Sequence, residues 1–138
     1  MSLFVLTGAG CSSTTRSSIL PAQPATPTAN SGYSGYLGAT IPTSFPADIP
    51  RYPNAKTVAA TSVYGVATLV QDTHTTPSDV IAWVKTQFTT MGASKSDEGD
   101  EPHGGKSFTY EKEGFVFHAR IDVSADGQAL LTITKESR

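Results

Sequence analysis

Charge and proline are distributed so unevenly that only part of this chain can form a conventional domain. Before residue 50 the only Lys, Arg, Asp or Glu side chains are Arg16 and Asp48, and seven of the nine prolines precede residue 54. Residues 12–47 are rich in Ser, Thr, Pro, Ala and Gly. Segments of this composition bury too little apolar surface to offset the entropy lost on ordering. We therefore expect a flexible tether at residues 12–47 and a globular domain at residues 48–138.

The nearly equal numbers of basic and acidic residues argue against one class of partner, nucleic acids. The chain has 10 Lys and Arg residues against 12 Asp and Glu residues, for a net charge of −2. Nucleic-acid-binding proteins use a basic surface to displace counterions, so we expect no nucleic-acid partner. The single cysteine, Cys11, cannot form an internal disulfide.

The first part of the expected domain has the pattern of a lead-in followed by two paired strands. Residues 49–55 contain two prolines, so we expect an extended lead-in with a turn at Pro53-Asn54. Residues 56–63 and 66–72 are rich in β-branched side chains, and Tyr64-Gly65 between them predicts a hairpin turn.

A single helix is expected next, from Pro77 to Met91. Thr76-Pro77-Ser78-Asp79 supplies an N-cap, a proline at the first helical position and an acid in the first turn. Gly92 lies where a glycine commonly ends a helix. The apolar residues of this stretch recur at helical spacing: Val80, Ile81, Val84, Phe88 and Met91. Trp83 falls at the flank of this apolar stripe.

Further strands are expected after the helix, at residues 106–112, 115–123 and 128–135. Residues 93–96 are a candidate short strand, and the acidic stretch at residues 97–105 is expected to form a loop. The resulting order, ββα(β)βββ, predicts an α+β fold. In it, a mostly antiparallel sheet of about five strands carries one amphipathic helix packed on one face.

The strand at residues 115–123 indicates which of its side chains face the helix. Alternate residues point to opposite faces of a sheet. The apolar set should face the helix: Phe115, Phe117, Ala119, Ile121 and Val123. The other set should form an outer face: Val116, His118, Arg120 and Asp122.

The N-terminus resembles a lipoprotein signal. A short apolar run at residues 3–6 is followed by small residues and then by Cys11, and Leu6-Thr7-Gly8-Ala9-Gly10-Cys11 resembles the lipobox of bacterial lipoproteins. The resemblance implies that residues 1–11 are the remnant of a lipoprotein signal peptide, with Cys11 as the lipidation site. It also implies a place in the bacterial cell envelope, with the domain in the periplasm or outside the membrane.

The domain itself resembles small bacterial envelope lipoproteins. The resemblance is carried by Pro50-Arg51-Tyr52-Pro53-Asn54-Ala55, which is similar to their P-x-Y-P-x-A opening, and by the helix at residues 78–92. It covers roughly residues 45–135. It implies an α+β domain of unassigned function, without a catalytic residue to transfer.

The remaining candidate residues point to binding rather than to catalysis. The three histidines, His74, His103 and His118, do not have metal-ligand spacing, and no G-x-S-x-G motif occurs. We therefore expect no catalytic site, no metal ion and no cofactor. Aromatic and arginine side chains are common interface anchors. The residues that we expect to contact a partner are Trp83, His118, Arg120 and Asp122.

The sequence thus predicts a lipid-anchored envelope protein whose domain binds a protein or a cell-wall component. One alternative is a periplasmic carrier of a small ligand, with an apolar pocket between helix and sheet lined by Phe88, Phe108, Phe115 and Phe117. Another is an enzyme that uses the outer face of the strand at residues 115–123.

Overall fold

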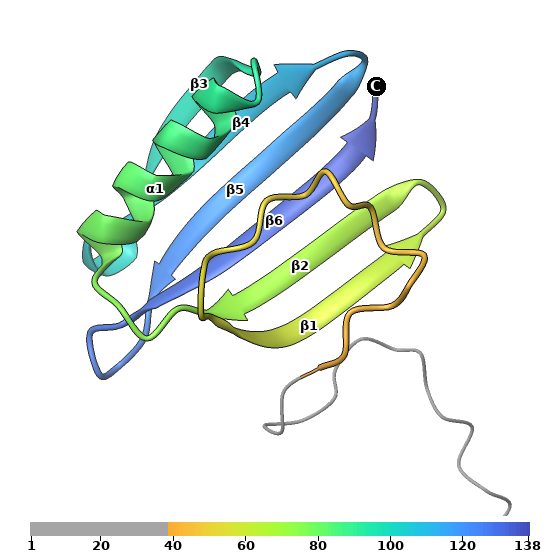
Figure 1. Ribbon diagram of the computed structural model, residues 1–138. Coiled ribbons are helices and arrows are strands. Elements are labelled where there is room, and N and C mark those ends of the chain that lie inside the picture. The colour runs from red at the N-terminus through yellow and green to blue at the C-terminus, as the bar shows by residue number, and fades with distance from the viewer. Residues whose placement is uncertain (1–38) are drawn as a thin grey trace, which may run out of the picture.

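The computed structural model describes residues 39–138, in which six antiparallel strands form one sheet with a single α-helix on one face (Figure 1). The elements are β1 (Lys56–Val63), β2 (Val66–Asp72), α1 (Pro77–Thr90), β3 (Ser94–Glu101), the 3₁₀ turn η1 (Pro102–Gly104), β4 (Gly105–Lys112), β5 (Phe115–Val123) and β6 (Ala129–Ser137). The strands lie in the order β1-β2-β6-β5-β4-β3, so β1 and β3 are the edges. The α+β class and the element order of the prediction are confirmed, with six strands in place of about five.

The sixth strand is β3, which begins in the candidate short strand at residues 93–96 and continues to Glu101. The prediction of a loop was therefore wrong for residues 97–101, whereas residues 102–104 form the 3₁₀ turn η1 and Gly105 begins β4. Acidic residues are uncommon in strands, which favoured a loop from the sequence. However, β3 pairs only with β4 and is therefore an edge strand, where charged side chains are common. Three lysines lie around Glu98, with Nζ–Oε distances of 2.6, 3.3 and 3.9 Å for Lys95, Lys85 and Lys106.

These contacts predict that acid will weaken the fold through Glu98. The hydrogen bond from Lys95, followed by contacts with Lys85, holds the pKa of Glu98 below its ordinary value. A carboxylate with a lowered folded-state pKa adds stability above its unfolded-state pKa, and this stability is lost as the pH falls through the folded-state pKa. We expect the melting temperature of a Glu98→Gln variant to fall less steeply than that of the wild type between about pH 6 and about pH 2.

Circular dichroism melts across this pH range would measure the effect. Asp97→Asn, at the preceding position of the same strand, is the matched control and should reproduce the wild-type profile. Identical pH profiles for Glu98→Gln and the wild type would show that the lysine contacts add no pH-dependent stability.

Helix α1 forms where the capping residues predicted it. The Asp79 backbone N–H donates to the Thr76 hydroxyl oxygen at 3.3 Å, and that hydroxyl donates to the Asp79 carboxylate at 2.8 Å. The helix ends at Thr90 with Met91 as its C-cap, one residue before the predicted end, and Gly92 follows with φ +75°. Val80, Val84 and Phe88 are buried against the sheet.

The core lies between the sheet and the layer that covers its inner face. The Phe88 ring stacks on Tyr110, with centroids 4.3 Å apart, and meets Phe117 edge-on at 5.5 Å. The buried cluster consists of Phe45, Ile49, Ala60, Ala67, Leu69, Val80, Val84, Phe88, Phe108, Tyr110, Phe117, Ala119, Ile121, Ala129, Leu131 and Ile133. The expected alternation along β5 is confirmed for its central residues, whereas Phe115 is 38% exposed.

The segment at residues 39–55 forms the rest of the covering layer. It crosses the same face of the sheet as α1, over the strands that the helix leaves uncovered (Figure 1). Phe45 and Ile49 are buried in the core, and the Lys135 ammonium lies 2.6 Å from the Asp48 carboxylate. The core therefore extends to the N-terminal side of residue 48, where the sequence placed the start of the domain.

The rest of the expected tether, at residues 12–38, lies outside the described residues, as does Cys11. Within residues 39–138, no helix is both long enough and apolar enough to cross a lipid bilayer.

Candidate functional site

The candidate site is the face of the sheet that points away from α1. Both α1 and the segment at residues 39–55 lie on the inner face, so the described chain places no second layer on the opposite face (Figure 1). We call this opposite surface the outer face. Strand alternation and the cross-strand pairs assign to β5 and β4 the outer-face residues Val116, His118, Arg120, Asp122, Ser107, Thr109 and Glu111.

His118 is held in place by two polar contacts on the outer face. Its Nδ1 lies 3.2 Å from the Thr109 hydroxyl oxygen on β4, and its Nε2 lies 3.2 Å from the Glu136 carboxylate on β6. Neighbouring strands continue the same row, since His118 pairs with Thr134 and Thr134 pairs with Thr68. The hydroxyl oxygens of these two threonines are 3.1 Å apart.

Arg120 forms a second charged group on the outer face. Its Nε donates to Asp122 Oδ1 at 2.9 Å, and its Nη2 lies 3.2 Å from Glu101 Oε2 at the end of β3. The Arg120 side chain remains 54% exposed, so it can exchange these intramolecular partners for a carboxylate on another molecule. The structure thus brings His118, Arg120 and Asp122 together on one strand, as expected from the sequence.

The outer face divides into a charged half and an uncharged half. The charged half follows β5 and the strands beyond it. On β1, β2 and β6 most outer-face positions carry uncharged side chains: Thr61, Val63, Val66, Thr68, Val70, Leu130, Thr132 and Thr134. The charged exceptions are Asp72 at the end of β2 and Glu136 beside His118. A neutral area beside charged groups is typical of protein interfaces, where apolar contact gives affinity and charge gives specificity.

Trp83 does not join this site. It lies on α1, on the opposite side of the sheet from His118, and packs partly buried against the core. Its indole ring meets Tyr52 of the N-terminal segment in an edge-on contact, with ring centroids 5.1 Å apart. Trp83 thus joins the two parts of the covering layer, and its contact with a partner stays a prediction.

Three of the four phenylalanines proposed for a ligand pocket are core residues. Phe88, Phe108 and Phe117 are buried, and only Phe115 reaches the surface. This packing favours a binding surface on the outside of the domain over one between helix and sheet. Among residues 39–138, no three His, Cys, Asp or Glu side chains gather to hold a metal ion.

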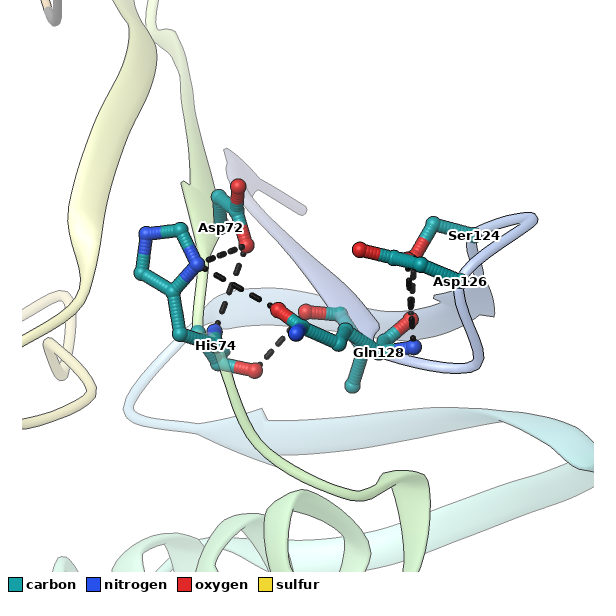
Figure 2. Close-up of polar contacts among 7 residues, drawn as sticks. Asp72, His74, Ser124, Asp126 and Gln128 are labelled. Atoms are coloured by element: carbon teal, nitrogen blue, oxygen red, sulfur yellow. Dashed lines mark hydrogen bonds and ion pairs between the residues drawn. The ribbon is translucent and has the colours of Figure 1, made fainter.

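A second polar cluster, which the sequence analysis missed, joins the β2–α1 loop to the β5–β6 hairpin (Figure 2). His74 Nδ1 lies 3.4 Å from the Asp72 carboxylate and 3.3 Å from Gln128 Oε1. Ser124 and Asp126 hydrogen-bond to each other within the hairpin, and the Ser124 hydroxyl donates to the Gln128 carbonyl at 2.8 Å.

Short-range signals for this cluster were present in the sequence. Asp72 and His74, like Ser124 and Asp126, are two residues apart, a spacing typical of side chains that stabilise turns. The hydrogen bond from Ser124, followed by that from the Gln128 backbone N–H, lowers the pKa of Asp126. The Gln128 contact with His74 depends on long-range packing. These contacts hold the β2–α1 loop against the β5–β6 hairpin.

Comparisons with protein-family models, with curated proteins and with solved structures each find no match to this chain.

Proposed function

We propose that this chain is a lipid-anchored protein of a bacterial envelope, attached through Cys11, whose domain binds a partner through the outer face of its sheet without catalysis of its own. The observation that carries this proposal is the outer face itself. In the described chain it has no covering layer, and it combines an uncharged area with the exposed His118 and Arg120 groups.

The chemistry of the outer face favours a protein partner. Charges of both signs lie within one strip, with Arg120 between Asp122 and Glu101, and His118 beside Glu136. Mixed charges of this kind select a partner with the complementary arrangement. The neighbouring threonines and valines can pack against apolar side chains of that partner. A cell-wall component is the other outcome that the experiment below can reveal.

Capture of the partner from envelopes tests the outer face. The full-length protein, cross-linked in its native membranes, should co-purify with one protein. Arg120→Ala should reduce the captured amount about tenfold or more, because truncation of an interface hot spot, a class in which arginine is enriched, costs about 2 kcal/mol or more. Arg51→Ala, which removes an exposed arginine from the N-terminal segment, is the matched control and should leave capture unchanged.

Two results would contradict the proposal. Equal capture by Arg120→Ala, His118→Ala and the wild type would remove the outer face as the binding site, and recovery of cell-wall fragments instead would replace the protein partner. Membrane fractionation of a Cys11→Ala variant tests the anchor separately. Recovery of that variant in the membrane at the wild-type level would show that Cys11 does not carry the anchor.

A further inference from the structure

The exposed large apolar side chains of the described residues lie at one end of the sheet. They are Val63, Tyr64 and Val66 around the β1–β2 turn, and Phe115 at the start of β5. Phe115 pairs with Ser137, and a Cβ placed on Gly65 would lie 3.7 Å from the Ser137 hydroxyl oxygen, so the two groups are neighbours. We call this region the hairpin end.

Tyr64 occupies a backbone conformation that bulky side chains avoid. It forms a two-residue turn with Gly65 between the paired Val63 and Val66, and its φ is +50° while that of Gly65 is +81°. Turns with positive φ at both positions favour Asn, Asp or Gly at the first. The Tyr64 side chain is fully exposed, at 101%, so packing within the described chain does not compensate for this strain. A strained residue without a structural benefit suggests a function outside the fold.

The β4–β5 turn provides an internal comparison. Glu113 and Gly114 adopt nearly the same conformation, with φ of +51° and +82°. That turn lies at the same end of the sheet and places an acidic side chain where the β1–β2 turn places tyrosine. The geometry alone therefore does not require an aromatic residue at position 64.

The charges at the hairpin end are close to balanced. Two ion pairs lie there, with Arg138 2.7 Å from Glu111 and Lys135 2.6 Å from Asp48, and Lys112 and Glu113 stand side by side in the β4–β5 hairpin. The opposite end of the sheet carries Asp72 at the end of β2, Asp79 in the first turn of α1 and Asp126 in the β5–β6 hairpin, and Figure 2 shows Asp72 and Asp126 near each other there. Negative membrane surfaces repel acidic groups. The domain would therefore turn its hairpin end, rather than its loop end, toward an anionic bilayer.

We propose that the hairpin end inserts Tyr64, together with Val63 and Val66, into the interfacial layer of a lipid bilayer. The side chains around the β1–β2 turn are exposed, with Tyr64 fully so, and a fluid bilayer can surround such a turn without a shaped groove. Tyrosine is suited to this depth because its ring is apolar and its hydroxyl is polar. The proposal rests on the proposed function in one respect: the anchor on Cys11 would keep the bilayer within reach of the domain.

Vesicle flotation with the full-length Cys11→Ala chain tests the insertion, because no attached lipid can then carry the protein upward. The probe is a vesicle of phosphatidylcholine with a minority of phosphatidylglycerol. The Cys11→Ala chain should float with these vesicles. Adding Tyr64→Asn should lower the bound fraction about tenfold, as expected for the loss of one large apolar contact. The same substitution should raise the melting temperature, because asparagine suits the turn.

Glu113→Asn, in the same Cys11→Ala background, is the matched control. It should also raise the melting temperature and should leave vesicle binding unchanged. Absence of flotation by the Cys11→Ala chain would overturn the insertion, and so would equal flotation with and without Tyr64→Asn. Loss of protein capture with Tyr64→Asn, without any change in flotation, would instead assign the tip to a protein partner. The capture experiment with Arg120→Ala tests partner binding by the outer face, and flotation tests bilayer insertion by the hairpin end. Either proposal can therefore fail without the other.

Discussion

Replacement of Phe45 by alanine will lower the free energy of unfolding of the full chain by about 3 kcal/mol or more. Phe45 is 5% exposed and belongs to the core, although it lies in a proline-rich segment without regular secondary structure. Alanine at this position would remove a ring from the layer that covers the inner face and would leave a cavity beneath the segment. Since a domain of this size is stable by only about 5–15 kcal/mol, the loss would be a large share of the total.

Urea titration followed by circular dichroism would measure this difference. Thr43→Ala, at an exposed position of the same segment, is the control and should change the free energy of unfolding by no more than about 0.5 kcal/mol. Equal stability of Phe45→Ala and Thr43→Ala would mean that the Phe45 ring contributes nothing to the core and that the folded domain begins after it, near residue 48.

Phe88→Ala should have an effect of similar or greater size, about 3–5 kcal/mol. Phe88 is fully buried on α1, and its ring stacks on Tyr110 and contacts Phe117 edge-on. These contacts join the helix to two strands, so their loss weakens the packing of the helix on the sheet. Aromatic pairs of this geometry add about 0.5–1.5 kcal/mol beyond the burial of their area.

The same urea titration would measure this loss. Phe115→Ala removes the same side chain from a position that is 38% exposed, and it should cost clearly less than Phe88→Ala. A cost for Phe88→Ala below about 1 kcal/mol would contradict a central role for this ring in the core.

The elements that the sequence predicted correctly are those marked by capping residues, turn residues or side-chain alternation. The Thr76 cap placed the start of α1, and Tyr64-Gly65 placed the first hairpin turn between β1 and β2. The period of two along β5 separated Phe117 and Ile121 from His118 and Arg120. Each of these signals depends on residues that are close in the sequence, so it predicts the element without knowledge of the tertiary structure.

The candidate site was predictable only in part. Alternation placed His118, Arg120 and Asp122 on one face, but their partners Thr109, Glu136 and Glu101 come from other strands. Those contacts depend on the register of β3, β4, β5 and β6, which no short-range pattern specifies. The apolar stripe of α1 placed Trp83 near the core, yet its contact with Tyr52 requires the N-terminal segment to fold back.

The sequence by itself determined the helix, most of the strands and the faces of β5, because caps, turns and side-chain periodicity act locally. Tertiary structure alone decided that the acidic stretch at residues 97–101 continues the edge strand β3 and that Phe45 belongs to the core. In both cases local preference pointed elsewhere, and the outcome depended on distant partners. For β3 these partners are the backbone of β4 and the lysines around Glu98, and for Phe45 they are the side chains of the inner face that α1 leaves uncovered.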